Sequence, residues 1–360
     1  MTATKKATAV KRSLVTGACG FIGSHVVEQL AAAGHEVIAA DHPSVWEGGD
    51  DVKRGRYPRL VSRLATKTVS FELSDAGSFS SLPIDVDYVF HVAAVFNYTA
   101  PYAELFRVNV EGTRALLGHF AKSRKLKRWV QWGAGGVYGM PSTRGNVPFF
   151  EDLAPMPSNN YLKSKWEQEF MVMSEAPKLG IDWTIVRPTT VYGPRAAYGS
   201  SQMFLGVLDP PVVAVPSSMT GRIPFIHVVD VARAAIHLAQ VKTGANQVFN
   251  TNDDTVMNAV EFMQAMARLL GKPFLKLPPL PVGKLIKAAA PILDFQFWLM
   301  RDVLGKQPLV EPDMLAMATE DFVYPNDKLK ATGFEFTYPD ARMAFAETLD
   351  WYLNTYKSGE

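Results

Sequence analysis

The chain has 360 residues, of which 48% are hydrophobic, and it carries a formal net charge of +2 and one cysteine, Cys19. The length is large for a single hydrophobic core, so we expect a main domain and a smaller second region. The charge gives no support to a nucleic-acid partner, and the lone cysteine excludes internal disulfides and makes a cysteine-based metal site unexpected.

The first half of the chain alternates short apolar runs with segments of helical length. Strands are expected at Ser13–Thr16, Glu36–Asp41, Thr68–Leu73, Tyr88–Val92, Arg128–Trp132, Trp183–Arg187 and Gln247–Thr251. Helices are expected from the first glycine turn to about Ala33, and at Glu104–Ser123, Tyr161–Lys178 and Val229–Gln240. Strands that alternate with helices predict a doubly wound parallel sheet with helices on both faces, which is an α/β fold.

Two stretches interrupt this alternation. The segment Pro43–Lys67 is rich in Asp, Arg and Lys, and we interpret it as a solvated loop. The alternation of strands and helices also becomes irregular after Tyr192, where several prolines interrupt regular secondary structure. The second region of the protein is therefore expected to begin near residue 193.

Glycines follow the first strand at a spacing of three, at Gly17, Gly20 and Gly23, with Phe21 and Ile22 between the last two. Without a Cβ, a turn lets its backbone approach a pyrophosphate and lets the next helix pack on the strand. The helix N-terminus then offers free N–H groups and a positive dipole end. The motif therefore predicts a dinucleotide site.

Asp41 closes the second strand, where an acidic residue binds the hydroxyl groups of the adenosine ribose. A carboxylate there repels a 2′-phosphate, so we expect NAD(H) rather than NADP(H). Arg54 or Arg56 in the following loop could reverse this preference. The alternative interpretation of Asp41 is a helix N-cap before Pro43.

Tyr161 and Lys165 are four residues apart near the start of an expected helix, which places both on one helical face. A nearby ammonium favours the phenolate, so we expect the pKa of Tyr161 to fall below its usual value of about 10. The phenol could then exchange a proton with a substrate oxygen while a hydride moves to or from nicotinamide. The lysine could also hold the nicotinamide ribose.

Taken together, these motifs resemble those of the extended short-chain dehydrogenases/reductases, the superfamily of NAD-dependent epimerases, dehydratases and 3β-hydroxysteroid dehydrogenases. Further segments that resemble the family are Phe90–Ala94, Val108–Thr113, Arg187–Pro194 and Phe225–Ala234. The resemblance implies a Rossmann-type fold and an NAD-dependent oxidoreductase acting on a secondary alcohol or ketone. It also implies catalytic roles for Tyr161 and Lys165, and cofactor contacts from Ala93, Ala94, Asn109 and Pro188.

One position departs from the family pattern. The family usually carries Ser or Thr where this chain has Ala134, and that hydroxyl binds the substrate oxygen. Losing such a donor costs about 10²–10³ in rate if nothing replaces it. Tyr98, Thr99 or a backbone amide of the glycine run at Gly135 could replace it. Otherwise the tyrosine works alone, or the protein binds NAD with little turnover.

Residues 280–304 are apolar with sparse charges, and Pro291 is expected to break them into two helices. They could form a core helix, cover an apolar substrate, or lie in a membrane interface. Phe297 and Thr190 are further candidate substrate contacts. The tail from Tyr324 to Phe334 is similar to those of 3β-hydroxysteroid and sterol-4-carboxylate 3-dehydrogenases, which implies an often membrane-associated insertion at this place.

We therefore expect a Rossmann domain at residues 1–192, to which 223–253 partly return, and a mostly helical substrate region at 193–222 and 254–360. Basic residues are few between 193 and 222, which disfavours a UDP-sugar. An NAD-dependent 3β-hydroxysteroid or sterol dehydrogenase is the leading hypothesis, including a 4-carboxysterol that decarboxylates after oxidation. The alternatives are a nucleotide-sugar 4-epimerase or dehydratase, and an NAD-binding sensor without turnover.

The sequence shows no signal peptide and no run of the roughly 18 apolar residues that a transmembrane helix needs. We therefore expect a cytoplasmic protein, either free or associated with a membrane surface. By analogy with the family, the helices at Glu104–Ser123 and Tyr161–Lys178 are expected to form a homodimer.

Overall fold

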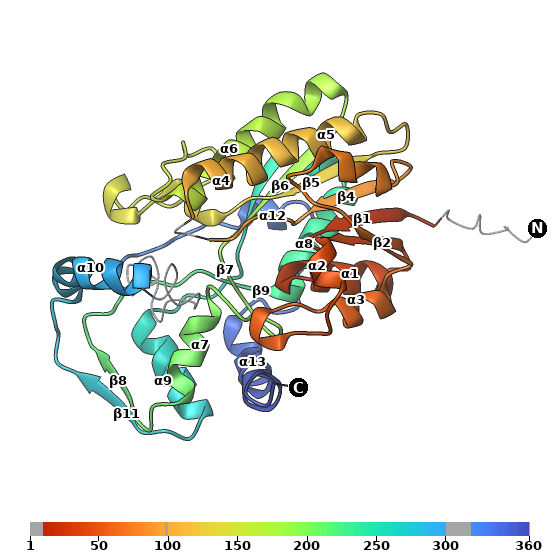
Figure 1. Cartoon of the computed structure of the whole chain (residues 1–360). Coiled ribbons are helices and arrows are strands. Elements are labelled where there is room, and N and C mark those ends of the chain that lie inside the picture. The colour runs from red at the N-terminus through yellow and green to blue at the C-terminus, as the bar shows by residue number, and fades with distance from the viewer. Residues whose placement is uncertain (1–9, 98–99, 300–317, 360) are drawn as a thin grey trace, which may run out of the picture.

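The computed structural model of the protein describes residues 10–97, 100–299 and 318–359. Its main sheet has seven strands, all parallel, in the order β10-β6-β5-β4-β1-β2-β3 (Figure 1). Their bounds are β1 Arg12–Thr16, β2 Glu36–Asp41, β3 Lys67–Ser70, β4 Tyr88–His91, β5 Arg128–Trp132, β6 Trp183–Pro188 and β10 Gln247–Thr251. The predicted doubly wound α/β fold is confirmed.

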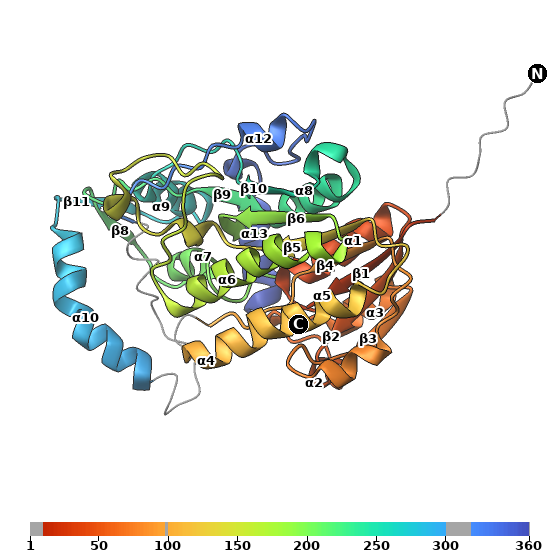
Figure 2. The ribbon, with the colours of Figure 1, turned by 90° about the horizontal axis from the view of Figure 1, so that it is seen from above.

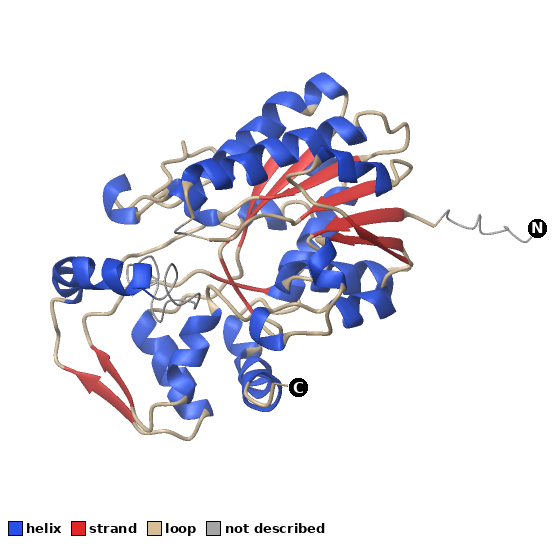
Figure 3. Ribbon diagram, viewed as in Figure 1, coloured by secondary structure: helices blue, strands red, loops and turns tan. Residues whose placement is uncertain are grey.

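Helices cover both faces of this sheet (Figures 1 and 3). One face carries α1 Phe21–Ala32, α2 Pro43–Trp46, α3 Pro58–Leu64 and α8 Val228–Gln240. The other carries α4 Tyr102–Leu105, a π-helical segment Phe106–Gly112, α5 Thr113–Phe120 and α6 Asn160–Glu175. Because both faces are covered, the central strands are buried at every residue rather than at alternate residues.

The order of the strands indicates where the ligand crevice lies. β1 pairs with β2 on one side and with β4 on the other, so the chain reverses its direction of travel across the sheet at this point. In open parallel sheets, ligands bind at the carboxyl ends of the strands beside such a reversal. The glycine turn follows β1, and the wall from Val92 to Phe96 follows β4.

The remaining elements form a second region with its own core. Their bounds are β7 Thr190–Tyr192, α7 Ser201–Leu208, β8 Val213–Pro216, β9 Phe225–His227, α9 Ala259–Leu269, β11 Phe274–Leu277 and α13 Phe345–Trp351. The short helix α12 Asp327–Lys330 returns to the main sheet, where it packs near β10 and buries Leu329 in the core. β7 pairs with β9, and β8 with β11. The core of the region is aromatic, with Phe204, Phe225, Phe262, Phe345 and Tyr352 in mutual contact.

Two expectations about local structure are wrong. Pro43–Lys67 contains two helices and buries Val52, Tyr57 and Val61, because its apolar residues pack beneath its charged ones. Pro291 does not break the chain into two helices, since a proline removes only one backbone donor. The result is a single helix, α10 Val282–Trp298, at the edge of the molecule (Figure 2).

Several predicted elements end earlier than expected. The third strand stops at Ser70, and the helix that follows β4 stops at Phe120. In the described part of the chain, no helix combines the length and the apolar character needed to cross a membrane.

Candidate active site

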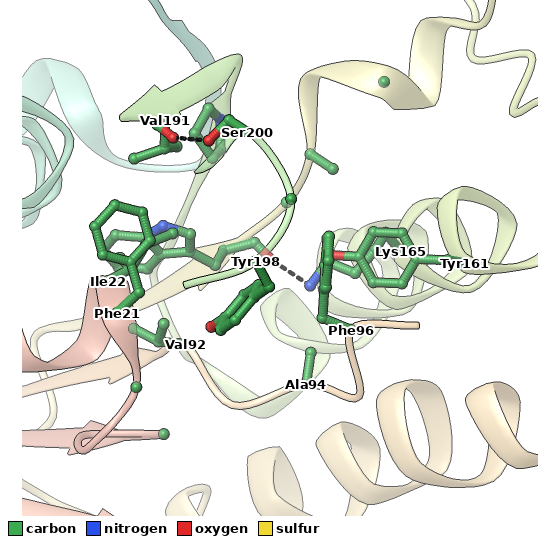
Figure 4. Close-up of a pocket in the computed structure, with 18 of the residues that line it drawn as sticks. Phe21, Ile22, Val92, Ala94, Phe96, Tyr161, Lys165, Val191, Tyr198 and Ser200 are labelled. Atoms are coloured by element: carbon green, nitrogen blue, oxygen red, sulfur yellow. Dashed lines mark hydrogen bonds between the residues drawn. The ribbon is translucent and has the colours of Figure 1, made fainter. Parts of the chain in front are cut away.

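A cleft of about 690 Å³ opens at the carboxyl ends of β1 and β4 (Figure 4). The glycine turn forms one end, the start of α6 forms a side, and the segments after β4, β5 and β6 complete the walls. Most of the residues predicted for the site line this cleft: Gly17, Gly20, Phe21, Ile22, Gly23, Asp41, Ala93, Ala94, Ala134, Gly135, Tyr161, Lys165, Pro188 and Thr190.

Backbone crowding explains the glycine turn. A Cβ on Gly23 would lie 2.0 Å from the carbonyl oxygen of Gly17, so the helix could not pack this close to the turn. Gly17 itself has φ +64°, and a Cβ there would lie 2.9 Å from the Cα of Ala93. The turn therefore brings the N-terminus of α1 directly against the cleft, which fits the pyrophosphate of NAD.

Asp41 is held by the same turn. Its carboxylate accepts hydrogen bonds from the Cys19 and His42 amides, both at 2.8 Å, and burial raises its pKa. His42, and not Asp41, caps α2, so the N-cap interpretation of Asp41 is wrong. Arg54 and Arg56 line the same end of the cleft. This end therefore holds both the acid that favours NAD(H) and the two arginines that could favour NADP(H).

Asn109 lies beneath the cleft wall rather than on it. Its side chain is buried, accepts a hydrogen bond from the Val95 amide at 2.8 Å and donates to the Val95 carbonyl and to Ser164. It therefore ties the wall after β4 to α6. Through this contact Asn109 sets where the wall stands relative to Tyr161.

The tyrosine and lysine stand side by side on α6, which begins with the side chain of Asn159 capping the Leu162 amide at 2.8 Å. Lys165 is buried, and its Nζ donates to the Trp132 carbonyl at 2.7 Å and to Gln168 at 2.5 Å. Burial lowers the pKa of Lys165 to about 8.

The expected fall in the pKa of Tyr161 is wrong in this structure. Burial raises that pKa instead, and Tyr198 adds to the increase. The phenol is therefore protonated at neutral pH. In that form it can donate a hydrogen bond to a substrate oxygen and deliver a proton to a developing alkoxide.

Ala134 places a methyl group where the family carries a hydroxyl, and it packs against Tyr161 and Leu162. The Ala134 amide donates to Glu169 at 3.3 Å. Among the described residues, the next two amides, of Gly135 and Gly136, donate no hydrogen bond, and the buried Thr190 hydroxyl has no partner. We propose the two amides as the donors that replace the missing hydroxyl, because the Thr190 oxygen has almost no accessible surface and is sealed from the open cleft.

A buried ion pair supports this wall from behind. Arg187 and Glu169 approach to 2.8 Å with both side chains almost fully buried, and Arg187 also donates to the Tyr138 hydroxyl at 2.7 Å. A Cβ on Gly133 would lie 2.1 Å from Glu169. The strand end before Ala134 is thus held between α6 and β6.

Other predicted residues cannot be placed. Tyr98 and Thr99 lie outside the described residues, and so does the side chain of Phe297. Sequence reasoning missed other lining residues, namely Phe96, Met140, Met203, Phe322 and Tyr324, together with Tyr198. No spacing pattern marked them, although Phe96 follows the segment Phe90–Ala94 closely and Tyr324 begins the family-like tail.

Comparisons with known proteins agree with this geometry. The model of the NAD dependent epimerase/dehydratase family matches residues 13–251. A 3-beta-hydroxysteroid dehydrogenase of Mycolicibacterium neoaurum is 27% identical, with 96% of this chain and 92% of that protein covered. A UDP-glucose 4-epimerase of Mycolicibacterium smegmatis is also 27% identical, with 73% of this chain and 83% of that protein covered.

Among solved structures, UDP-glucose 4-epimerase of Thermus thermophilus in complex with NAD superimposes with a TM-score of 0.66. The two sequences are 22% identical, and the match covers 96% of this chain and 99% of the other. At this identity the likeness concerns the fold.

Proposed function

Because the chain belongs to the NAD dependent epimerase/dehydratase family and is an NAD-dependent oxidoreductase of the extended short-chain type, we propose that it oxidises the 3β-hydroxyl group of an apolar steroid or sterol, or reduces the matching ketone. The observation that carries the substrate class is the distribution of charge around the cleft. Apart from Lys165, the acidic, basic or imidazole side chains that line it in the described residues are Asp41, His42, Arg54 and Arg56.

All four of those side chains come from the end of β2 and the loop that follows, at the adenosine end of the site. Elsewhere the lining is mainly apolar, with Met140, Leu162, Met203 and Phe322 among its residues. A nucleoside diphosphate needs cations around its phosphates, whereas a sterol needs apolar area and one polar anchor.

The two basic residues of the segment 193–222, Arg195 and Arg222, are engaged elsewhere. Arg195 binds Ser24 at 3.1 Å and pairs with Glu28, while Arg222 pairs with Asp321 at 3.0 Å. Neither lines the cleft. This pairing supports the sterol proposal over a UDP-sugar, because freeing either arginine for a diphosphate would break an existing ion pair.

The chemistry follows from the two residues on α6. Bound NAD supplies the hydride acceptor, and the glycine turn, Asp41 and Lys165 are the groups placed to hold it. In the reduction direction the Tyr161 phenol donates a proton to the substrate oxygen, and in the oxidation direction its phenolate form accepts the proton of the substrate hydroxyl. Lys165, fixed by the Trp132 carbonyl, keeps a positive charge beside the phenol and stabilises negative charge that develops there.

A nucleotide-sugar 4-epimerase or dehydratase is the second candidate, since relatives of both kinds match the chain. An NAD-binding sensor without turnover is a third, and it is favoured only by the missing hydroxyl at Ala134. Turnover is supported by the tyrosine and lysine, which both line the cleft.

Contacts with partners are part of the proposal. We infer a homodimer through the outer faces of α4, α5 and α6, on which Phe170 is exposed. A peripheral membrane contact through α10 is supported by its exposed Leu285, Ile292 and Phe295. The compartment proposed for such a protein is the cytoplasm.

The deciding experiment is a substrate panel with NAD⁺, monitored by NADH absorbance. We expect NADH from 3β-hydroxysteroids and 4-carboxysterols, and none from the 3α-epimer of the same steroid, which is the matched control. Conversion of UDP-glucose to UDP-galactose without release of NADH would replace the sterol proposal by the epimerase. NAD⁺ binding without turnover on any member of the panel would favour the sensor.

A further inference from the structure

Behind the cleft, a network of five buried polar side chains joins Lys165 to the strand that precedes the glycine turn. Lys165 Nζ donates to the amide oxygen of Gln168 at 2.5 Å, and the amide nitrogen of Gln168 donates to the Thr113 hydroxyl at 2.7 Å. The Thr113 hydroxyl bonds Nε2 of His91 at 2.8 Å, and Nδ1 of His91 bonds the Thr16 hydroxyl at 2.8 Å. All five side chains are buried.

The fold brings the ends of four elements together at this network. Thr16 ends β1 and His91 ends β4, and the two residues are partners in the sheet. Thr113 begins α5, and Gln168 follows the lysine by three residues on α6, which places both on one helical face. Thr16 also accepts a hydrogen bond from the Ala93 amide at 3.2 Å. The network therefore starts at the lysine and returns to the cleft wall beside the glycine turn.

The chemistry of the lysine determines which way the Gln168 amide faces. An ammonium has three protons and accepts no hydrogen bond, so the amide oxygen must face Lys165 and the amide nitrogen must face Thr113. A second ammonium proton goes to the Trp132 carbonyl at 2.7 Å. Among the described residues these two oxygens are the acceptors of Lys165 Nζ, so its third proton is left for a group bound in the cleft.

Apart from the ammonium, the groups of the network are neutral. Burial, together with the charge of Lys165, lowers the pKa of His91 to about 3, so its imidazole is uncharged at neutral pH. The carboxamide of Gln168 holds the ammonium without cancelling its charge, whereas a carboxylate at this distance would cancel it. The positive charge therefore stays available to the phenolate form of Tyr161, which lies beside the lysine (Figure 4).

We propose that Gln168 is a positioning residue that holds the Lys165 ammonium beside Tyr161 through an uncharged hydrogen-bond acceptor. The bond from its amide nitrogen to Thr113, and from there to His91, keeps the carboxamide in place. Gln168 does not line the cleft, so it acts through the lysine. The inference rests on the proposed function only in taking the tyrosine and lysine as the reacting pair and NAD as the ligand of the cleft.

Gln168→Met and Gln168→Glu test the two parts of this role. Methionine has a similar length but only a weakly accepting sulfur, so Lys165 loses one of its two acceptors. Glutamate keeps an acceptor of the same shape, but its charge cancels that of the ammonium, and it has no N–H for Thr113. In both variants we expect the single-turnover rate of NADH formation, at saturating NAD⁺ and substrate, to fall about 10- to 100-fold.

Cofactor affinity shows whether the effect is more than structural. ADP carries the adenosine and pyrophosphate of NAD⁺ but lacks the nicotinamide ribose, which Lys165 is placed to hold. In calorimetric titration, Gln168→Met should bind NAD⁺ about two- to tenfold more weakly and ADP with unchanged affinity. A general disturbance of the network would weaken both ligands, because the network ends at Ala93 beside the glycine turn.

Gln240→Met and Gln240→Glu are the matched controls. Gln240 also accepts a hydrogen bond from a lysine, Lys11, at 2.8 Å, and it lies at the end of α8, outside the cleft lining. These variants should leave the rate and both affinities unchanged.

An undiminished rate in either Gln168 variant would overturn the proposal, and so would NAD⁺ and ADP affinities of Gln168→Met that change by the same factor. If the unchanged protein turned over no member of the substrate panel, the sterol proposal would fail alone. The two affinities of Gln168→Met would then decide the inference.

Discussion

At the cofactor end of the cleft, backbone atoms decide which residues can be present. A Cβ on Gly23 would lie 2.0 Å from the Gly17 carbonyl oxygen, and one on Gly17 would lie 2.9 Å from the Ala93 backbone. At the substrate end the walls are side chains, among them Leu162, Met203 and Phe322. The first kind of wall tolerates one residue type, whereas the second tolerates any apolar side chain of similar volume.

The difference explains why the cofactor is better determined than the substrate. A pyrophosphate is recognised by N–H groups that every chain with this turn must present. A substrate is recognised by the shape left between side chains from distant segments. Substitutions at the cofactor end should therefore strongly weaken NAD⁺ binding. Substitutions in the second region should instead change stability, through packing, burial and charge.

The largest expected effect is at the buried ion pair of Arg187 and Glu169, behind the wall of the cleft. Arg187→Met leaves Glu169 buried without its partner and should destabilise the protein by about 3–5 kcal/mol. Chemical denaturation measures this free energy of unfolding. The double variant Arg187→Met/Glu169→Gln should recover part of the loss. No recovery would mean that the buried charge is not the cause.

Gly23→Ala tests the backbone-determined end. Relieving a 2.0 Å approach forces the turn or α1 to move, at a cost of roughly 1–3 kcal/mol, so NAD⁺ should bind about 10- to 100-fold more weakly. Gly118→Ala is the control, because a Cβ there meets nothing within 4 Å. Equal NAD⁺ affinity in the two variants would contradict the crowding argument.

The same division between backbone walls and side-chain walls determines how much of the site could be predicted from the sequence. Gly17, Gly20, Gly23, Tyr161 and Lys165 are marked by local spacing, and they lie together in the cleft. The chemistry of a group depends on more than spacing. Burial by residues from several segments raises the pKa of the tyrosine, and no sequence interval encodes that burial.

The positions of residues that depend on tertiary packing could not be predicted from the sequence. Tyr198 reaches the glycine turn because Arg195 is tied to α1, a contact between residues 171 positions apart. The helix through Pro291 also departs from the sequence pattern, since the pattern registers the missing donor but not whether the flanking turns persist. Long-range contacts of these kinds carry no periodic signal.

In the second region, a buried carboxyl should control stability. Burial raises the pKa of Asp253 from 3.8 to about 7, and among the described residues its Oδ2 has no hydrogen-bond partner. The folded state thus holds this proton more tightly than the unfolded chain. The group's contribution to stability is therefore greatest below the unfolded pKa and declines as pH rises towards 7.

Asp253→Asn removes that dependence. The variant should be more stable than the unchanged protein at pH 8, by on the order of 2 kcal/mol, and should show little difference at pH 4. Thermal denaturation across this range is the measurement. A stability difference that did not change with pH would exclude the carboxyl as its source.

The smallest of these effects is expected at Ala134. If the Gly135 and Gly136 amides already serve the substrate oxygen, Ala134→Ser should raise kcat by no more than about tenfold, well below the factor of 10²–10³ for restoring a missing donor. Steady-state kinetics with the best steroid of the panel measures this. A rise of the larger size would mean that Tyr161 works without a second donor.

The central claim is that the Tyr161 phenol moves the proton of a substrate hydroxyl beside bound NAD. Single-turnover formation of NADH by Tyr161→Phe, at saturating NAD⁺ and steroid, tests it most directly. The account predicts a rate about 10²–10⁴-fold below that of the unchanged protein, with the affinity for NAD⁺ preserved. An undiminished rate would contradict it.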